Sequence, residues 1–121
     1  MQTSFESNVP IYLQIVDKIK RYIISGEGKA GERLPSVREF AAQMQVNPNT
    51  VQKALTDLEE NGLMYTERTN GKFITQDSAL LAKVRGEYAS ALVEKYLQDM
   101  QNIGVDRKKA IDFLKNSEKK E

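Results

Sequence analysis

Five polar side chains between residues 47 and 53 are of the kinds that read nucleic-acid bases. They are Asn47, Asn49, Thr50, Gln52 and Lys53. Asparagine and glutamine can form two hydrogen bonds to the edge of adenine, and threonine can bond a phosphate or contact a thymine methyl group. Arg38 adds a guanidinium fork that suits a base edge or a phosphate. Taken singly, each residue is better explained as part of a solvated helix face, so the elements that carry them decide the matter.

Capping signals define the elements around this cluster. Ser36 is a good N-cap, and Glu39 follows three positions later as in a capping box, which predicts a short helix. Asn47 caps the next helix, which has Pro48 in its first position and ends before Gly62. The polar cluster therefore lies in the turn between two helices and in the first turn of the second one, where the helix N-terminus itself favours a phosphate.

Apolar residues recur at spacings of three and four in both helices and in an earlier one, which is expected to begin at Pro10 with Asn8 as a candidate cap. The inward residues are Tyr12, Ile15, Ile19, Tyr22 and Ile23, then Val37, Phe40, Ala41 and Met44, and then Val51, Ala54, Leu55 and Leu58. The polar cluster lies on the side opposite the last of these faces. We expect it to point toward solvent or a ligand.

After Gly62 the apolar period changes to 2, which predicts a β-hairpin with its tip at residues 68–72. Asn70 and Gly71 are turn residues that tolerate positive φ. Two helices, a strand, a turn and a strand form the outline of a winged helix-turn-helix, which presents one helix to a DNA major groove and the hairpin to the adjacent backbone. We therefore predict that the chain binds double-stranded DNA. The predicted contacts are Ser36, Arg38, Asn47, Asn49, Thr50, Gln52, Lys53, Asn70, Gly71 and Lys72.

Composition narrows the remaining functions. The 121 residues suffice for one core and a helical extension, and the absence of cysteine and histidine removes thiolate chemistry, the commonest metal ligand and the usual neutral-pH base. We expect no enzyme, no cofactor and no metal, and no signal or membrane span, hence a cytoplasmic protein. The net charge is only +1, and residues 1–75 carry nine basic and nine acidic side chains, so attraction to DNA depends on local placement.

Residues 76–121 are predicted to form two helices. The first starts at Ser78, Gly104 stops it, and Asp106 caps the second. The apolar stripe of the first helix comprises Leu81, Val84, Tyr88, Leu92, Tyr96 and Met100. Two helices leave no room for an enclosed ligand pocket of about 300 Å³, so we expect a dimerisation tail that buries this stripe against a second copy. The alternative is that the tail folds back on its own winged helix.

The whole is expected to be mainly α with a small β-hairpin: a winged helix-turn-helix DNA-binding domain in residues 1–75 and a two-helix C-terminal dimerisation tail in residues 76–121. Within it, LPSVREFA, VNPNTVQKAL and LEENGL resemble the GntR family of bacterial transcription regulators over residues 9–75, and NPNTV with the short tail resembles its YtrA-like branch. The resemblance implies a dimer that represses transcription from a palindromic operator, often of a transporter operon. It also implies that the second helix of the motif enters the major groove and that the wing tip reaches the minor groove.

Residue by residue, the resemblance implies that Arg38 contacts a guanine or a phosphate, that Thr50 contacts a phosphate, and that Gly71 lets the wing backbone approach the minor groove. Where many relatives have arginines, this chain has Pro48 and Gln52. These two departures favour an operator with more A·T character.

Other functions stay open or are disfavoured. The winged helix could serve as a protein-interaction or RNA-binding module, and a small-molecule effector could bind between the tail helices of the dimer. The glycines of residues 26–31 lack the order of a phosphate-binding loop and are interpreted as a turn. Glu59 and Glu60 point in different directions on one helix, which does not suit paired acid and base catalysis, and we interpret them as solvated charges.

Overall fold

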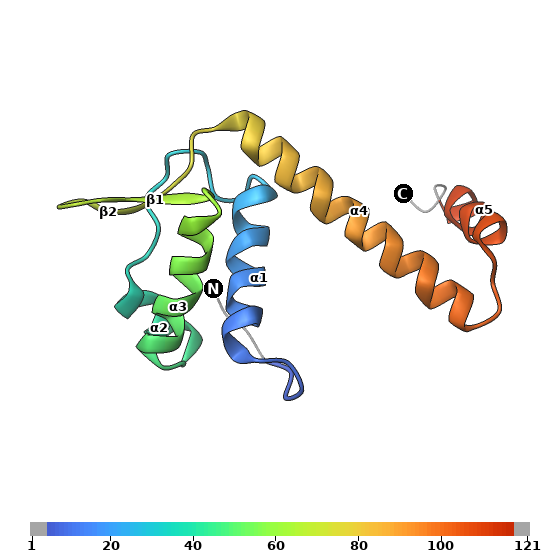
Figure 1. Cartoon of the computed structure of the whole chain (residues 1–121), viewed down its shortest axis with the longest axis horizontal. Coiled ribbons are helices and arrows are strands. Elements are labelled where there is room, and N and C mark those ends of the chain that lie inside the picture. Colours follow the sequence, from blue (N-terminus) through green and yellow to red (C-terminus); the bar gives the residue numbers. More distant parts are fainter. Residues whose placement is uncertain (1–4, 118–121) are drawn as a thin grey trace. The chain divides into compact units, whose positions relative to one another are not determined.

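A computed structural model describes residues 5–117, which form five helices and one two-stranded antiparallel sheet. The elements are α1 (Ile11–Ile24), α2 (Val37–Met44), α3 (Pro48–Glu60), β1 (Met64–Glu67), β2 (Gly71–Ile74), α4 (Ser78–Asn102) and α5 (Arg107–Ser117), as drawn in Figure 1. The chain divides into two compact units, one up to Val84 and one from Arg85 onward. Within residues 5–117, no helix is both long and apolar enough to cross a bilayer.

The starts of α2 and α3 follow the predicted capping chemistry. The backbone N–H of Glu39 donates to Ser36 Oγ at 3.1 Å, and the N–H of Ser36 donates to Glu39 Oε1 at 2.8 Å. This capping box satisfies donors at the α2 N-terminus. At α3 the N–H of Asn49 donates to Asn47 Oδ1 at 2.7 Å, and Pro48 occupies the first helical position.

The start of α1 differs from the prediction. Pro10 is the cap residue rather than the first helical one, and no side chain caps the helix, so the expected role of Asn8 is wrong. Gln14, within α1, bonds the backbone of the preceding segment instead. Its Nε2 donates to the carbonyls of Glu6 and Val9, and its Oε1 accepts from the N–H of Glu6. These bonds hold the segment before α1 against the helix.

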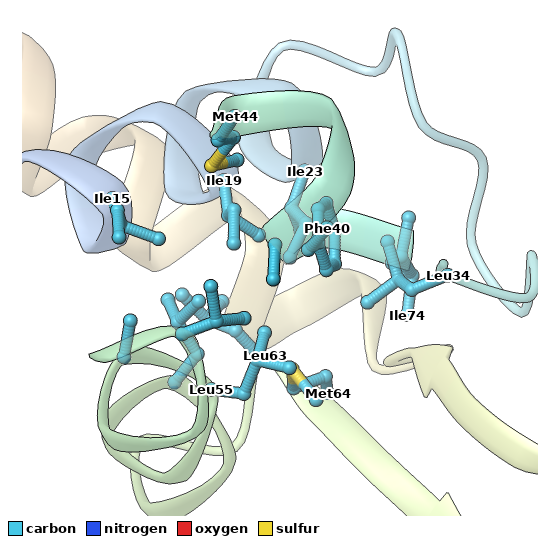
Figure 2. Packing of buried hydrophobic residues seen from close by; sticks show 14 residues of the cluster. Ile15, Ile19, Ile23, Leu34, Phe40, Met44, Leu55, Leu63, Met64 and Ile74 are labelled. Carbon is cyan, nitrogen blue, oxygen red and sulfur yellow. The ribbon is translucent and has the colours of Figure 1, made fainter. Parts of the chain in front are cut away.

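The core of the first unit is built from the inward faces of α1, α2 and α3 and from the base of the hairpin (Figure 2). Its fully buried members include Ile15, Ile19, Phe40, Val51, Leu55, Leu58, Leu63 and Ile74. Leu81 and Val84, in the first turns of α4, pack against this core and are half-buried. Apolar burial of this kind, at about 25 cal/mol per Å², is what fixes the three helices relative to the hairpin.

The turn between α2 and α3 depends on one unusual residue. Gln45 has φ +57°, the only positive φ of a non-glycine residue in the described chain. Its backbone N–H donates to the carbonyl of Ala41, and the N–H of Val46 donates to the same carbonyl at 3.1 Å. The left-handed conformation at Gln45 ends α2, and only residues 45–47 separate α2 from α3.

The hairpin pairs β1 with β2 in the register Met64 with Ile74 through Glu67 with Gly71. A third segment runs along the other edge of β2, where Gly31 N–H donates to Ile74 O, Ile74 N–H to Glu32 O and Leu34 N–H to Lys72 O, all within 2.9 Å. The stretch between α1 and α2 is thereby fastened to the hairpin. This pairing gives the wing a fixed position relative to the helices of its unit.

Candidate nucleic-acid interface

Helix α3 has two distinct faces. Val51, Ala54, Leu55 and Leu58 are buried in the core, whereas Asn49, Gln52, Lys53 and Thr56 are exposed. The exposed face carries amide, hydroxyl and ammonium groups, which are the groups that bond base edges and phosphates. The structure thus brings together, on one surface, the polar residues that the sequence placed on the outer side of this helix.

Asn47 uses only half of its amide for folding. Its Oδ1 caps α3, while its Nδ2 makes no hydrogen bond within the described chain, and the side chain is exposed. Asn49 is exposed at the second position of the helix, and Thr50 is half-buried one residue later. The N–H groups of Asn49 and Thr50 already donate to Asn47, so the helix dipole, rather than free N–H groups, gives this end of α3 partial positive charge that suits an anionic backbone.

Further along α3, Gln52 bonds to its own helix. Its Nε2 donates to Thr56 Oγ1 at 3.2 Å, one helical turn away. The amide oxygen of Gln52 remains available as an acceptor, and the exposed pair offers both a donor and an acceptor to a base edge. This bond restricts the rotamers of Gln52, so the side chain would lose less conformational entropy on contacting a base.

Lys53 is oriented by an aromatic ring on α1. Its Nζ lies 3.9 Å from the centre of the Tyr12 ring, a cation–π geometry. Tyr12, Lys53 and Thr50 line an open hollow between the starts of α1 and α3, together with Ile11 and Asn49. Tyr12 was expected only as a core residue, and this second role was missed, because nothing in the local sequence pairs it with a lysine on another helix.

The start of α2 presents Ser36 and Arg38. Ser36 Oγ accepts the capping bond from the N–H of Glu39, and its hydroxyl group also interacts with the Glu39 carboxylate. The hydrogen bond from the Ser36 N–H and the interaction with the Ser36 hydroxyl hold the pKa of the Glu39 carboxyl below its ordinary value. At neutral pH this carboxylate is therefore charged, and Ser36 is its hydrogen-bond partner. Arg38 is exposed and forms no hydrogen bond or ion pair with residues 5–117, so its guanidinium is free for a ligand.

The tip of the wing combines a glycine turn with a distant arginine. Gly71 has φ +104°, which L side chains rarely adopt, and Asn70 has no positive φ, so only one of the two predicted turn residues uses this freedom. Asn70 Nδ2 donates to Glu67 Oε1 at 3.3 Å. Its carbonyl accepts from Arg33 Nε at 2.9 Å. Arg33 was not among the predicted contacts, and its position far from residues 68–72 in sequence gave no signal.

Lys72 points back toward α3 rather than away from the wing. Its Nζ donates to Thr66 Oγ1 at 3.0 Å and lies 3.5 Å from Glu59 Oε1, which also accepts from Thr66 Oγ1 at 3.0 Å. Glu59 is therefore not the solvated charge that we expected, because it joins the end of α3 to both strands of the hairpin. Glu60 is exposed, as expected. A DNA contact by Lys72 stays a prediction, and it would have to compete with this ion pair.

The tail residues have two different environments. Leu81 and Val84 are half-buried on the core of the first unit, and this intrachain contact covers part of their apolar surface. In the second unit, Tyr88, Tyr96 and Met100 are half-buried, while 49% of Leu92 is exposed. Tyr96 Oη donates to the carbonyl of Ala110 at 2.6 Å and so ties α4 to α5. Exposed apolar side chains accompany this stripe at Val93, Ile103, Ile111, Phe113 and Leu114.

A helix-turn-helix with a fastened β-hairpin and a polar outer face on its second helix defines a winged helix-turn-helix DNA-binding domain. The family model described as "Bacterial regulatory proteins, gntR family" matches residues 11–74. The chain belongs to the GntR family. It is a DNA-binding transcription regulator and not an enzyme, as the sequence predicted.

Similar proteins agree with this assignment over most of the chain. The transcriptional repressor YtrA of Bacillus subtilis is 33% identical over 116 residues, which cover 95% of this chain and 89% of that protein. The structure of a GntR family transcriptional regulator from Listeria monocytogenes has a TM-score of 0.85 and 38% identity, and the match covers 93% of this chain and 98% of that one. The structure of the AraR DNA-binding domain in complex with operator ORX1 has a TM-score of 0.57 and 25% identity, covering 62% of this chain and 95% of that one.

Proposed function

We propose that the chain is a homodimeric repressor that binds a palindromic operator, with α3 of each protomer in the major groove and each wing at the adjacent minor groove. The observation that carries this proposal is the outer face of the α3 N-terminus, where Asn47, Asn49 and Gln52 are exposed. Arg38, at the start of α2, is exposed as well and has no partner within residues 5–117. The name of YtrA supports repression, and the AraR complex supports operator binding by a domain of this kind. A regulator with this target acts where the chromosome lies, in the cytoplasm.

Dimerisation is supported by the apolar surface of the second unit. Ile103 is 74% exposed, and Phe113 and Leu114 are more than half exposed. Such a surface is expected to be covered in solution, and a second copy of the tail is the occupant with a matching stripe. Two tails joined in this way would set the two copies of α3 about one DNA turn apart, roughly 34 Å.

The test begins with selection of duplexes from a random pool by the full-length protein, followed by affinity measurements on the recovered sequence. Arg38→Ala should weaken binding to that sequence by about 1 to 3 kcal/mol, and wild-type affinity should fall steeply with salt. Lys18→Ala, on the surface of α1 beside Leu13 and Asp17, is the control for loss of one positive charge. Selected half-sites should form an inverted repeat at a spacing of one helical turn.

Two results would refute the proposal. The first is a selection that enriches no duplex, together with binding of RNA or of a protein partner that is as tight for Arg38→Ala and Thr50→Val as for wild type. The other is a single, unrepeated half-site bound by one protomer, which would leave DNA binding in place and remove the dimer. A small-molecule effector would show separately, as a ligand-dependent change in operator affinity or melting temperature.

A further inference from the structure

Arg33 lies at the point where the segment between α1 and α2 meets the wing. Its Nε donates to the carbonyl of Asn70 at the wing tip. Its guanidinium also lies against Gly71, since a Cβ added to that glycine would come 3.1 Å from Nε and 3.3 Å from Nη2. The side chain therefore occupies the space beside Gly71 that any larger residue would need.

The backbone of Arg33 is as firmly placed as its side chain. Arg33 forms an isolated antiparallel bridge with Phe73, and its neighbours Glu32 and Leu34 exchange hydrogen bonds with β2. The backbone of Arg33 is held against β2 and its Nε bonds the carbonyl of Asn70, so this side chain links the turn to the segment between α1 and α2. Within the turn, the N–H of Asn70 donates to the carbonyl of Glu67 at 3.2 Å, and the Arg33 side chain adds a restraint on the Asn70 carbonyl from outside the hairpin.

Most of the donors of Arg33 are unused. Of the five N–H groups on a guanidinium, only Nε–H forms a hydrogen bond with the described residues, and the side chain is exposed. The two Nη groups form the planar fork that matches phosphate oxygens. Lys72, the basic residue of β2 next to the tip, is turned toward Glu59 instead. Arg33 therefore supplies positive charge to the tip of the wing from outside the hairpin.

We propose that Arg33 has two roles in operator binding: Nε holds the wing tip in its DNA-ready conformation, and the Nη groups bind a phosphate of the strand beside the minor groove. This inference rests on the proposed function, because the phosphate belongs to the operator that α3 reads. Arg33 is thus a contact residue as well as a positioning residue, and it makes the wing contact independent of Lys72.

The test uses full-length Arg33→Gln and Arg33→Lys on the selected duplex, with Lys18→Gln as the charge-matched control. Arg33→Gln should weaken binding about tenfold, lower the salt slope by about one, and remove hydroxyl-radical protection of the sugars beside the wing while keeping protection over the α3 half-site. Arg33→Lys should keep the salt slope and lose part of the wing protection, since one ammonium cannot hold the Asn70 carbonyl and a phosphate with the same geometry. Lys18→Gln should match wild type.

The outcomes separate this inference from the proposed function. If wild type protects a duplex and Arg33→Gln leaves affinity, salt slope and wing protection unchanged, the role of Arg33 is refuted and operator binding stands. If wild type protects no duplex, both fail. Melting temperatures of the variants check folding, and Arg33→Lys, which keeps charge and length, decides the case if Arg33→Gln does not fold.

Discussion

The ammonium group of Lys53 lies over the ring of Tyr12, 3.9 Å from its centre, so a residue of α3 is oriented by a residue of α1. Lys53 is exposed and Tyr12 is half-buried, and the contact adjoins the start of the helix that we propose to lie in the major groove. A cation–π pair at an exposed site contributes about 0.5 to 1 kcal/mol, which is enough to favour one rotamer of a flexible lysine. We therefore expect the Tyr12 ring to affect DNA binding by holding the Lys53 ammonium group in place.

Lys53→Gln should weaken binding to different duplexes about equally and lower the salt slope by about one, because a phosphate contact carries no sequence information. Tyr12→Leu should lower affinity less, through loss of the preferred rotamer, and Tyr12→Phe should keep it, because the ring is retained. Fluorescence anisotropy over a range of salt concentrations measures both quantities. Equal affinity and slope for Lys53→Gln and wild type would remove Lys53 from the interface.

Asn47 permits a separation of folding from DNA binding. Asn47→Ala should destabilise the protein by about 1 kcal/mol through loss of the α3 cap. Asn47→Asp should keep the stability of wild type, because aspartate caps as well and its charge suits a helix N-terminus. The same charge should strongly weaken operator binding by repelling phosphate. Thermal unfolding and duplex titration, run on both variants, measure the two effects.

Asn61→Asp is the matched control for this charge, since it adds a carboxylate at the other end of α3. A helix of 13 residues is about 20 Å long, and the Debye length at physiological salt is about 8 Å, so the added charge is screened from the α3 N-terminus. If Asn47→Asp and Asn61→Asp bound DNA equally, the start of α3 would not face the backbone.

Glu32 gives the fold a dependence on acid. The N–H of Lys29 donates to Glu32 Oε1 and Tyr22 Oη donates to Glu32 Oε2, each at 2.8 Å, and these bonds hold the pKa of the carboxyl below its ordinary value of 4.5. A lowered pKa means that the folded state favours the carboxylate. The resulting stability is present above pH 4.5 and is lost as the pH falls through the lowered pKa.

Glu32→Gln should therefore lower the melting temperature at neutral pH, and the difference from wild type should shrink as the pH falls below 4.5 and through the lowered pKa of the Glu32 carboxyl. Glu60→Gln is the control, because Glu60 is exposed and forms no hydrogen bond or ion pair with residues 5–117. Calorimetry across this pH range gives the comparison. A constant difference at every pH would show that the carboxylate charge contributes nothing.

The tail is tested by placing charge in its apolar stripe. Leu92→Glu puts a carboxylate on an exposed apolar position of α4 and should convert a dimer into monomers at micromolar concentration. Operator affinity should fall with it, since each protomer then binds one half-site. Sedimentation velocity and duplex titration measure the two effects, with Glu94→Gln as a neighbouring exposed control. A wild-type protein that sediments as a monomer at these concentrations would contradict the dimer.

Local chemistry was enough to predict most of the fold. Ser36 with Glu39 and Asn47 with Pro48 carry their capping signals within four residues, and the inward faces follow from helical periodicity. The left-handed turn at Gln45 was not predictable in this way, because no glycine marks it and only the packing of α2 against α3 requires it. At α1, Pro10 became the cap because its own conformation, not the side chain of Asn8, starts the helix.

The site residues that lie on a single helix could be predicted from the sequence. The contacts between residues of different elements could not. The outer face of α3 follows from the residues that it buries. The links from Arg33 to Asn70 and from Tyr12 to Lys53 join residues more than 35 positions apart, and no spacing rule connects them. The ion pair of Lys72 was missed for the same reason, since its partner Glu59 belongs to a different element.

The separation of the two faces of α3 has a consequence for how such regulators diversify. Because Asn49, Gln52 and Thr56 make no contribution to the core, we expect substitutions among them to be nearly neutral for folding and, under the proposed function, to alter which bases are preferred. Duplicated copies of a gene for this chain could thus acquire new target sequences by a few point changes, each passing through a folded intermediate. Packing holds the scaffold together without these residues, so the recognised sequence can change while the fold is kept.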